Sequence, residues 1–341
     1  MTLADRSGVV GIIANPASGR DIRRLVAQAT SISNQEKIAI VRRVIVGLAG
    51  AGIARVLMMP DPHGMARRGA QPPQGADWAL PEIDWVPISP QGTLEDSRLA
   101  AAQMAVEPVG CIVVLGGDGT VRAISQKVKD VPILALSTGT NNVLPTFLEP
   151  TVAGLAAGAV ARGRVALSAV AYRHKWLEVL VDQQPADRAL VDVALLRGRF
   201  VGARAIWDAS RLQALIVTRA NPATIGVSAI AGMLHPVSPQ EPRGLAAWLA
   251  PDAPRQIVAA LGPGLLVRLG AQEVQELTID QVVSYSITEP TIVALDGERE
   301  LALSRGQLLT VRLRAGGPWI VDGARVLQTM ATLPSHTDQC H

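Results

Sequence analysis

Residues 110–122 read Gly-Cys-Ile-Val-Val-Leu-Gly-Gly-Asp-Gly-Thr-Val-Arg, and the fold follows from this stretch. Residues 111–115 form an unbroken apolar run, which is typical of a strand buried on both faces of a parallel sheet. A glycine loop comes next, from Gly116 to Thr120, and residues 121–129 are compatible with a helix. This order predicts a phosphate-binding loop, because glycines let backbone N–H groups approach phosphate oxygens and a helix N-terminus favours negative charge.

An acidic residue, Asp118, lies inside this loop, where on its own it would repel a phosphate. The conflict is removed if Mg²⁺ lies between the two groups, or if the carboxylate takes a proton from an attacking hydroxyl. Both interpretations point to phosphoryl transfer, with Asp118 as the candidate catalytic residue. The alternative is a tight turn in which Asp118 only caps the helix. The phosphate-binding residues of the loop would be Gly116, Gly117, Gly119 and Thr120.

Length and composition limit the kinds of protein that this chain can be. At 341 residues, the chain is long enough for two domains, each with its own core. Hydrophobic residues make up 48% and charged residues 18%, which predicts a globular chain. The net charge is only +3, no basic block stands out, and aromatic residues are 3%, so a nucleic-acid partner is not expected. The two cysteines suggest no disulfide framework, and no apolar run is long enough for a membrane span, so a cytoplasmic protein is expected.

Apolar runs and helical patterns alternate through residue 147, which predicts an α/β domain with a doubly wound parallel sheet over residues 1–147. The expected strands are residues 9–14, 53–59, 83–88, 111–115 and 131–136. One helix is expected over residues 21–29. A second is expected to begin at the capping box Ser33-x-x-Glu36, and a third at Thr93-x-x-Asp96.

Two further polar loops follow strands of this domain. Because ligands bind at the carboxyl ends of parallel strands, these loops add candidate phosphate or nucleotide ligands. A capped turn and ordinary turn chemistry are the alternatives. After the first strand the candidates are Asn15, Ser18, Gly19 and Arg20, and after the last they are Thr138, Gly139, Thr140, Asn141 and Asn142.

From about residue 165 the pattern changes to short apolar runs separated by turns. This predicts a mainly antiparallel, sandwich-like β domain over residues 148–320. Helical periodicity is sparse, apart from a piece near residues 245–249, and Asp296-Gly297 is a hairpin signal. Residues 322–330 predict a last helix, within about 321–333, that packs back on the first domain.

These pieces resemble the superfamily that joins NAD kinases with diacylglycerol and sphingoid-lipid kinases. Gly116 to Thr120 is similar to its GGDGT signature, and Asn15 to Gly19 to the NPxSG loop of the lipid-kinase branch. Residues 138–142 resemble the GTxN loop, residues 190–193 the LN(E/D)V strand, and residues 295–298 the LDG(E/Q) hairpin. Over the whole chain, and most clearly in residues 11–25, the sequence is similar to the acetoin-catabolism X proteins, an ATP-NAD-kinase-like family.

The resemblance implies an ATP-dependent phosphotransferase that uses Mg²⁺ and phosphorylates NAD(H) or a related nucleotide, with a link to acetoin catabolism. It adds Asp192 to the nucleotide-binding residues, offers Asp296 and Glu298 as possible second carboxylates, and implies a homo-oligomer. No metal ligand is directly assigned. The plain hairpin turn is the alternative for Asp296 and Glu298.

Two departures keep other hypotheses open. Val191 replaces the Asn of the NAD-kinase strand, and residues 225–228 replace its Ser-Thr-Ala-Tyr. A lipid kinase of the diacylglycerol type is one alternative, and a nucleotide-binding regulator without catalysis is another. A Ser/His/Asp hydrolase lacks support, because the chain has no G-x-S-x-G elbow.

Overall fold

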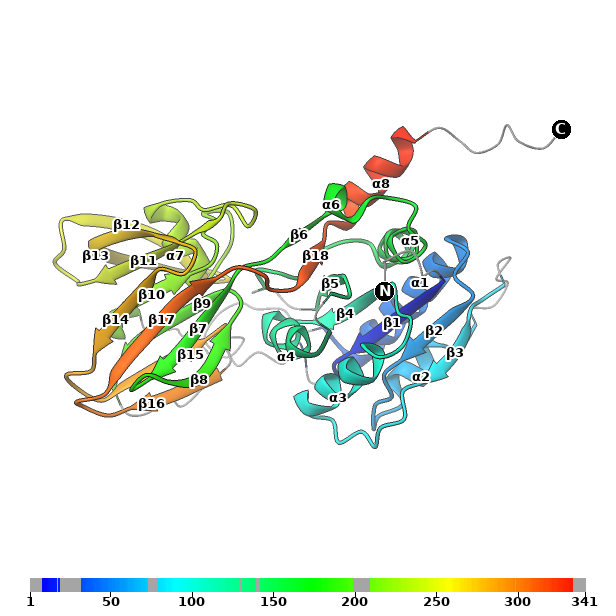
Figure 1. Ribbon diagram of the computed structural model, residues 1–341, viewed down its shortest axis with the longest axis horizontal. Helices are drawn as coiled ribbons and strands as arrows, with labels where there is room; N and C mark the ends of the chain where they lie inside the picture. Colours follow the sequence, from blue (N-terminus) through cyan, green and yellow to red (C-terminus); the bar gives the residue numbers. More distant parts are fainter. Residues whose placement is uncertain are drawn as a thin grey trace.

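The computed structural model describes residues 8–16, 18, 32–72, 79–128, 130–138, 142–198, 209–297 and 299–333. The helix expected over residues 21–29 lies outside these ranges, as do Gly19, Arg20, Gly139, Thr140, Asn141 and Glu298. Figure 1 shows two bodies joined by extended segments, an α/β part that contains β1 to β5 and a β-rich part that contains β7 to β17.

The first part is built on a seven-stranded sheet in the order β3-β2-β1-β4-β5-β18-β6. The first five strands are parallel, β18 pairs parallel with β5, and β6 pairs antiparallel with β18. Its strands are β1 (Val9–Ala14), β2 (Arg55–Met58), β3 (Glu82–Trp85), β4 (Cys111–Gly116), β5 (Ile133–Ser137), β6 (Ala171–Arg173) and β18 (Trp319–Val321). The predicted parallel sheet is confirmed.

Helices cover both faces of this sheet, as in a doubly wound fold. One hydrophobic core contains Val41 of α1 (Asn34–Gly50), Ala153 of α5 (Pro150–Ala161) and Val326 of α8 (Gly323–Thr332). The core on the opposite face contains Met104 of α3 (Leu94–Met104) and Ile124 of α4 (Asp118–Val128). Two short helices, α2 (Met65–Gly69) and α6 (Leu167–Val170), complete this part.

Helices α1 and α5 cross at very short range. Each contributes a glycine to the crossing, because a Cβ on Gly47 would lie 2.1 Å from the Thr151 carbonyl oxygen and one on Gly154 would lie 2.2 Å from the Val44 carbonyl oxygen. Helix α1 begins at the predicted capping box, in which the Glu36 carboxylate accepts the Ser33 N–H and the Ser33 hydroxyl accepts the Glu36 N–H.

The second part is a sandwich of two antiparallel sheets, as predicted. One sheet has the order β12-β13-β11-β10-β9-β15-β16 and the other β14-β17-β7-β8. The strands are β7 (Trp176–Val181), β8 (Gln184–Ala189), β9 (Asp192–Arg197), β10 (Leu212–Val217), β11 (Arg243–Leu249), β12 (Arg255–Gly262), β13 (Leu265–Thr278), β14 (Val282–Ser286), β15 (Thr291–Leu295), β16 (Arg299–Leu303) and β17 (Leu308–Arg314).

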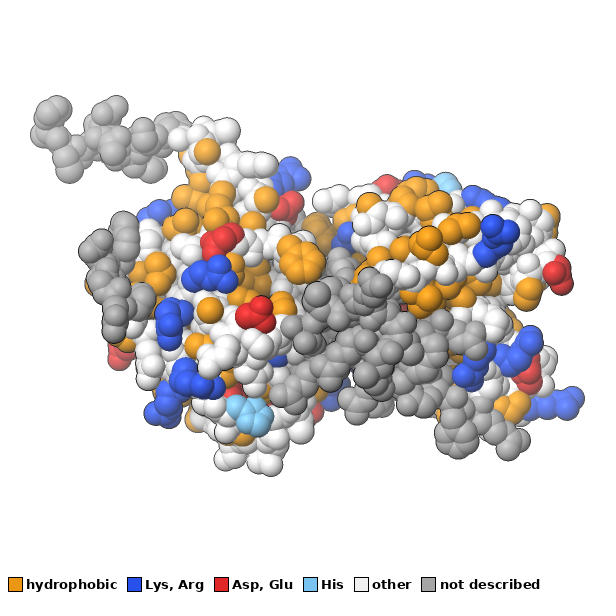
Figure 2. Space-filling view, turned by 180° about the vertical axis from the view of Figure 1, so that it is seen from behind, with side chains coloured by type: hydrophobic (Ala, Val, Ile, Leu, Met, Phe, Trp, Pro, Cys, Tyr) orange, Lys and Arg blue, Asp and Glu red, His pale blue; other side chains and the backbone are white. Residues whose placement is uncertain are grey.

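Helix α7 (Val227–Leu234) covers the outer face of the larger sheet, where Ile230 packs against Leu215 and Leu245 in one core. The helical piece expected near residues 245–249 is wrong, because these residues belong to β11. Its Leu-Ala-Ala-Trp-Leu sequence is almost wholly buried between α7 and the second sheet, so it carries an apolar run rather than an alternating pattern. On the outer strands, Val258 and Leu266 are exposed, and Figure 2 shows hydrophobic side chains gathered on the upper part of this body.

The chain crosses between the two parts twice, from β6 to β7 and from β17 to β18. The crossings run side by side, because the His174 N–H donates to the Pro318 carbonyl and the Gly317 N–H donates to the His174 carbonyl. After the second crossing, α8 packs against α5 of the first part. The division of the chain between residues 147 and 148 stays a prediction.

Candidate active site

Three polar loops meet at the carboxyl ends of β1, β4 and β5, which are neighbours in the sheet. The Asn15 amide donates to the Thr120 hydroxyl at 3.1 Å, which joins the first loop to the glycine loop. The Thr138 hydroxyl donates to the Ser18 hydroxyl at 3.0 Å, which joins the first loop to the third. These four side chains are buried, so the sequence-predicted residues of separate loops form one polar cluster.

A buried lysine holds the first loop from below. The Lys37 ammonium, from the first turn of α1, donates to the carbonyl oxygens of Asn15, Pro16 and Ser18 at 3.3, 2.9 and 2.6 Å. Lys37 is only 1% exposed to solvent. Sequence reasoning missed Lys37, although a signal was present, because it occupies the apolar stripe of α1 with Val41, Val44 and Leu48.

The glycine loop turns directly into α4, which begins at Asp118. The N–H groups of Thr120 and Val121 donate to the Gly117 carbonyl, so Gly117 stands at the helix start. Gly116 has a packing reason of its own, because a Cβ there would lie 2.6 Å from the Thr120 Cβ. The arrangement is the predicted strand, glycine turn and helix N-terminus, where backbone N–H groups face a potential anion.

Asp118 lies between the glycine loop and the third loop, and its side chain is almost wholly buried. Its two carboxylate oxygens accept the N–H groups of Val143 and Leu144 at 2.8 and 2.7 Å. In the same loop, the Asn142 amide donates to the Ser137 hydroxyl at 2.8 Å. Asp118 thus fixes the position of the loop that follows β5 relative to the glycine loop.

A second carboxylate, Asp296, lies in the turn between β15 and β16 and reaches α4 through Arg122. Its carboxylate accepts the N–H groups of Leu190, Val191 and Asp192 at 2.7–3.1 Å. Burial raises the pKa of Asp296, while Arg122 and the three N–H groups act in the opposite direction. The predicted hairpin turn is present, with φ of +50° at Asp296 and +68° at Gly297.

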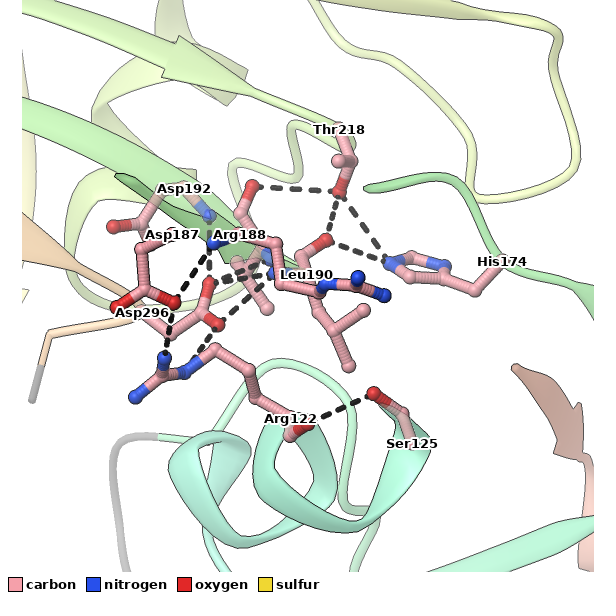
Figure 3. A network of polar contacts seen from close by, with 10 residues as sticks. Arg122, Ser125, His174, Asp187, Arg188, Leu190, Asp192, Thr218 and Asp296 are labelled. Atoms are coloured by element: carbon pink, nitrogen blue, oxygen red, sulfur yellow. Dashed lines mark hydrogen bonds and ion pairs between the residues drawn. The ribbon is translucent and has the colours of Figure 1, made fainter. Parts of the chain in front are cut away.

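Arg122 of α4 connects the two domains through this carboxylate (Figure 3). Its guanidinium lies 3.3 Å from Asp296 and 3.5 Å from Asp187 of β8, and its side chain is 3% exposed. The Asp296 carboxylate therefore links Arg122 of the first domain to the backbone of residues 190–192 in the second domain. Sequence reasoning missed Arg122, which stands two residues after the glycine motif on the buried face of α4.

Asp192, at the start of β9, belongs to the same region and is 6% exposed. Nearby, the His174 ring and the Thr218 hydroxyl both contact the Leu190 carbonyl oxygen, at 3.0 and 2.6 Å. Burial is the main cause that lowers the pKa of His174 to about 3, so the ring is neutral and Nε2–H donates to Leu190. Among the described residues, His174 Nδ1 has no hydrogen-bond partner.

The structure brings together Asn15, Ser18, Thr120, Asp118, Thr138 and Asn142, and places Asp192 and Asp296 on the facing domain. Within the described ranges, no group of three or more His, Cys, Asp or Glu side chains could hold a metal ion. In the same ranges, none of the helices is long and apolar enough to cross a membrane.

Comparisons with known proteins match two family models to this chain, one after the other. A family model described as the ATP-NAD kinase N-terminal domain matches residues 10–165, and one described as the acetoin catabolism protein X C-terminal domain matches residues 175–316. The yeast NADH kinase complexed with NADH has a similar fold, with a TM-score of 0.54 and 15% identity over 98% of this chain and 89% of that one.

A relative in Cupriavidus necator, acetoin catabolism protein X, is similar over most of its length. It is 41% identical over 315 residues, which are 89% of this chain and 87% of the relative. With both halves matched in the expected order, the chain belongs to the acetoin catabolism protein X family.

Proposed function

We propose that the protein is an ATP-dependent phosphotransferase that phosphorylates a hydroxyl group of NAD(H) or a related nucleotide. The observation that carries the proposal is the meeting of three polar loops around Asp118, at the carboxyl edge of a parallel sheet. The match to an ATP-NAD kinase N-terminal domain supports the same reaction class. The name of the curated relative supports a link to acetoin catabolism.

We assign the roles of the loop residues as follows. Asn15, Ser18 and the N-terminus of α4 approach the phosphates of ATP, while Asn142 and Asp192 line the acceptor side. Gly19, Arg20, Gly139, Thr140 and Asn141 stay proposed ligands of the same nucleotides. Because the phosphoryl group carries its own charge and little covalent chemistry is needed, positioning supplies most of the catalysis.

Asp118 receives the proton of the acceptor hydroxyl. As this O–H bond breaks, the oxygen forms a bond to the γ-phosphorus, and the bond between that phosphorus and the bridging oxygen of ADP breaks. In the alternative role, the Asp118 carboxylate would help to place a Mg²⁺ ion that arrives with ATP, because Mg²⁺ is commonly held by one or two carboxylates plus substrate phosphates. When bound, this ion neutralises phosphate charge.

The test incubates the full chain with Mg-ATP and NAD or NADH and measures NADP(H). We expect product from the natural sequence and a loss of kcat of about 10²–10⁴-fold in Asp118→Asn, with nucleotide affinity largely retained. A matched control is Asp96→Asn, because the Asp96 carboxylate is equally buried and also accepts backbone N–H groups, at Gln91, Gly92 and Thr93.

Full activity in Asp118→Asn would remove the proposed base. Nucleotide binding by calorimetry without any phosphorylated product would favour a regulator instead. Phosphorylation of detergent-dispersed diacylglycerol, but not of NAD(H), would favour the lipid-kinase alternative.

A further inference from the structure

The strongest unexplained group outside the loop cluster is Arg219, two residues beyond the end of β10. Its backbone is held on both sides, because the Thr218 N–H donates to the Val191 carbonyl and the Ala220 N–H donates to the Val237 carbonyl. The Ser228 hydroxyl donates to the Arg219 carbonyl itself at 3.3 Å. The side chain therefore extends from a fixed point, and it is half-buried.

The guanidinium of Arg219 is not neutralised within the described part of the chain. Its Nε atom is buried and has no hydrogen-bond acceptor there, and no carboxylate lies within ion-pair distance. Arg122 Nε also lacks a hydrogen-bond partner among the described residues, but the Arg122 guanidinium lies between two carboxylates, whereas that of Arg219 does not. An uncompensated buried donor costs free energy, so a native structure that keeps one calls for an explanation.

The charged groups that act on Lys175 in this region are one carboxylate, Glu241, and two guanidinium groups, Arg219 and Arg243. Lys175 donates to the carbonyl oxygens of Ser238, Glu241 and Arg243, so its ammonium is fully committed to that loop. Burial lowers the pKa of Lys175 to about 8, with the charge of Arg219 as a further cause. The region thus carries excess positive charge.

Tyr172 of β6 connects this region to the loop cluster of the first domain. Burial raises the pKa of the Tyr172 phenol, as do the charges of Asp322 and, less strongly, Asp118, while the charge of Arg219 and its hydrogen bond to the phenol oxygen act against the rise. In space, the Tyr172 ring packs edge-on against the His174 ring, with centroids 5.8 Å apart, and His174 Nε2 lies 3.4 Å from the hydroxyl of Thr218, the residue before Arg219. Tyr172 and Val143, whose N–H binds Asp118, also pack against the same hydrophobic core.

We propose that Arg219, positioned by Tyr172, binds a phosphate group of the nucleotide whose hydroxyl is presented to Asp118. A guanidinium suits this role, because its planar array of N–H donors matches phosphate oxygens in a bidentate fashion. The nucleotide would thus be held from both domains, by the three loops on one side and by Arg219 on the other. The identity of the anion as an acceptor phosphate rests on the proposed function.

The experiment measures binding by calorimetry, with pyrophosphate, NAD, ATP and adenosine as probes, for Arg219→Met and Arg219→Lys. We expect Arg219→Met to weaken pyrophosphate and NAD about 10- to 100-fold and to leave adenosine unchanged. Arg219→Lys keeps the charge but lacks the planar array of N–H donors. Its affinity for pyrophosphate and NAD should therefore lie between that of the natural sequence and that of Arg219→Met. Arg173→Met is the control. It removes a positive charge next to Tyr172 in β6, where the guanidinium already pairs with Asp130, and it should change none of these affinities.

A thermal melt without ligand separates binding from a structural role. Among the described residues Arg219 pairs with no carboxylate, so Arg219→Met loses at most the contact with the Tyr172 phenol and should melt within about 4 °C of the natural sequence. A clearly lower melting temperature, or unchanged pyrophosphate and NAD affinity, overturns the inference. Binding is measured without turnover, so a loss of affinity supports phosphate binding by Arg219 even if no NADP(H) forms. Unchanged affinity in an enzyme that does form NADP(H) rejects the role of Arg219 and leaves the proposed function standing.

Discussion

Lys37 is a single residue on which the geometry of the first loop depends. Its ammonium binds three carbonyl oxygens and is almost wholly buried. We expect Lys37→Met to lower the free energy of unfolding by about 2–4 kcal/mol, because buried carbonyls lose their donor. It should also weaken ATP binding, since Asn15 and Ser18 are no longer held.

Chemical denaturation and calorimetry check this prediction. Lys127→Met is the control, because Lys127 is exposed in the last turn of α4 and should change stability by less than about 0.5 kcal/mol. A Lys37→Met protein with unchanged stability would show that the three carbonyls are satisfied in another way.

His174 makes stability depend on pH. Its pKa falls to about 3 in the folded chain from an ordinary value of 6.5. Between these values the unfolded chain binds a proton that the folded chain does not, so stability falls as the pH is lowered from 6.5 towards 3. The expected slope is about 1.4 kcal/mol per pH unit.

In His174→Gln, the amide can still donate to the Leu190 carbonyl but does not titrate. We therefore expect a flatter acid limb of the stability curve, measured by urea unfolding between pH 4 and pH 7. An unchanged slope in His174→Gln would assign the acid loss to other groups.

Much of the candidate site could be predicted from the sequence, because each residue can be recognised from the strand directly before it. Asn15, Ser18, Thr120 and Thr138 each follow an apolar strand, and parallel strands bring their carboxyl ends to one edge. Lys37 and Arg122 could not be placed, because their partners are backbone carbonyls of another loop and carboxylates of another domain. The role of Asp296 likewise depends on N–H groups more than 100 residues away.

At the scale of elements, the crossing of α1 and α5 depends on two glycines. We expect Gly154→Ala to destabilise the protein by about 1–3 kcal/mol despite the higher helix propensity of alanine, because its Cβ would meet the Val44 carbonyl. Thermal unfolding measures the effect.

Gly50→Ala, at the end of α1, is the matched control for the crossing. Its Cβ would meet only the flexible end of Leu155 at 3.3 Å, so the change should be near neutral or stabilising. If both variants are equally stable, the close crossing does not constrain the helices.

Elements were predictable where caps or unbroken apolar runs mark them. The capping box at Ser33 and the run at residues 111–115 both mark real elements, α1 and β4. Residues 245–249 were misassigned because a strand covered on both faces loses its alternation and resembles a buried helix. Helix α7 was missed for the same reason, since it is apolar nearly all round.

At the scale of the whole molecule, Arg122 joins the two domains through Asp187 and Asp296. We expect Arg122→Met to cost about 3–5 kcal/mol, because it leaves buried carboxylates without their cation. It should also increase cleavage by limited proteolysis at the crossings between the domains.

A double-mutant cycle with Asp187→Asn measures the coupling across the interface. Arg173→Met, which breaks the exposed pair with Asp130, should cost less than about 1 kcal/mol. Additive effects of Arg122→Met and Asp187→Asn would mean that this pair does not couple the domains.

The placement of β18 has a consequence for biosynthesis. Strands β1 to β5 leave the ribosome first, and residues 135–137 of β5 can pair with Thr146 soon afterwards. The edge at Ile133, however, stays open until residues 319–321 are made, about 180 residues later in the chain. An open strand edge can pair with another chain, so the nascent chain has a long interval of exposure to chaperones or to aggregation. A premature stop before β18 would leave this part of the edge uncovered for good, so such truncated products should accumulate as insoluble material.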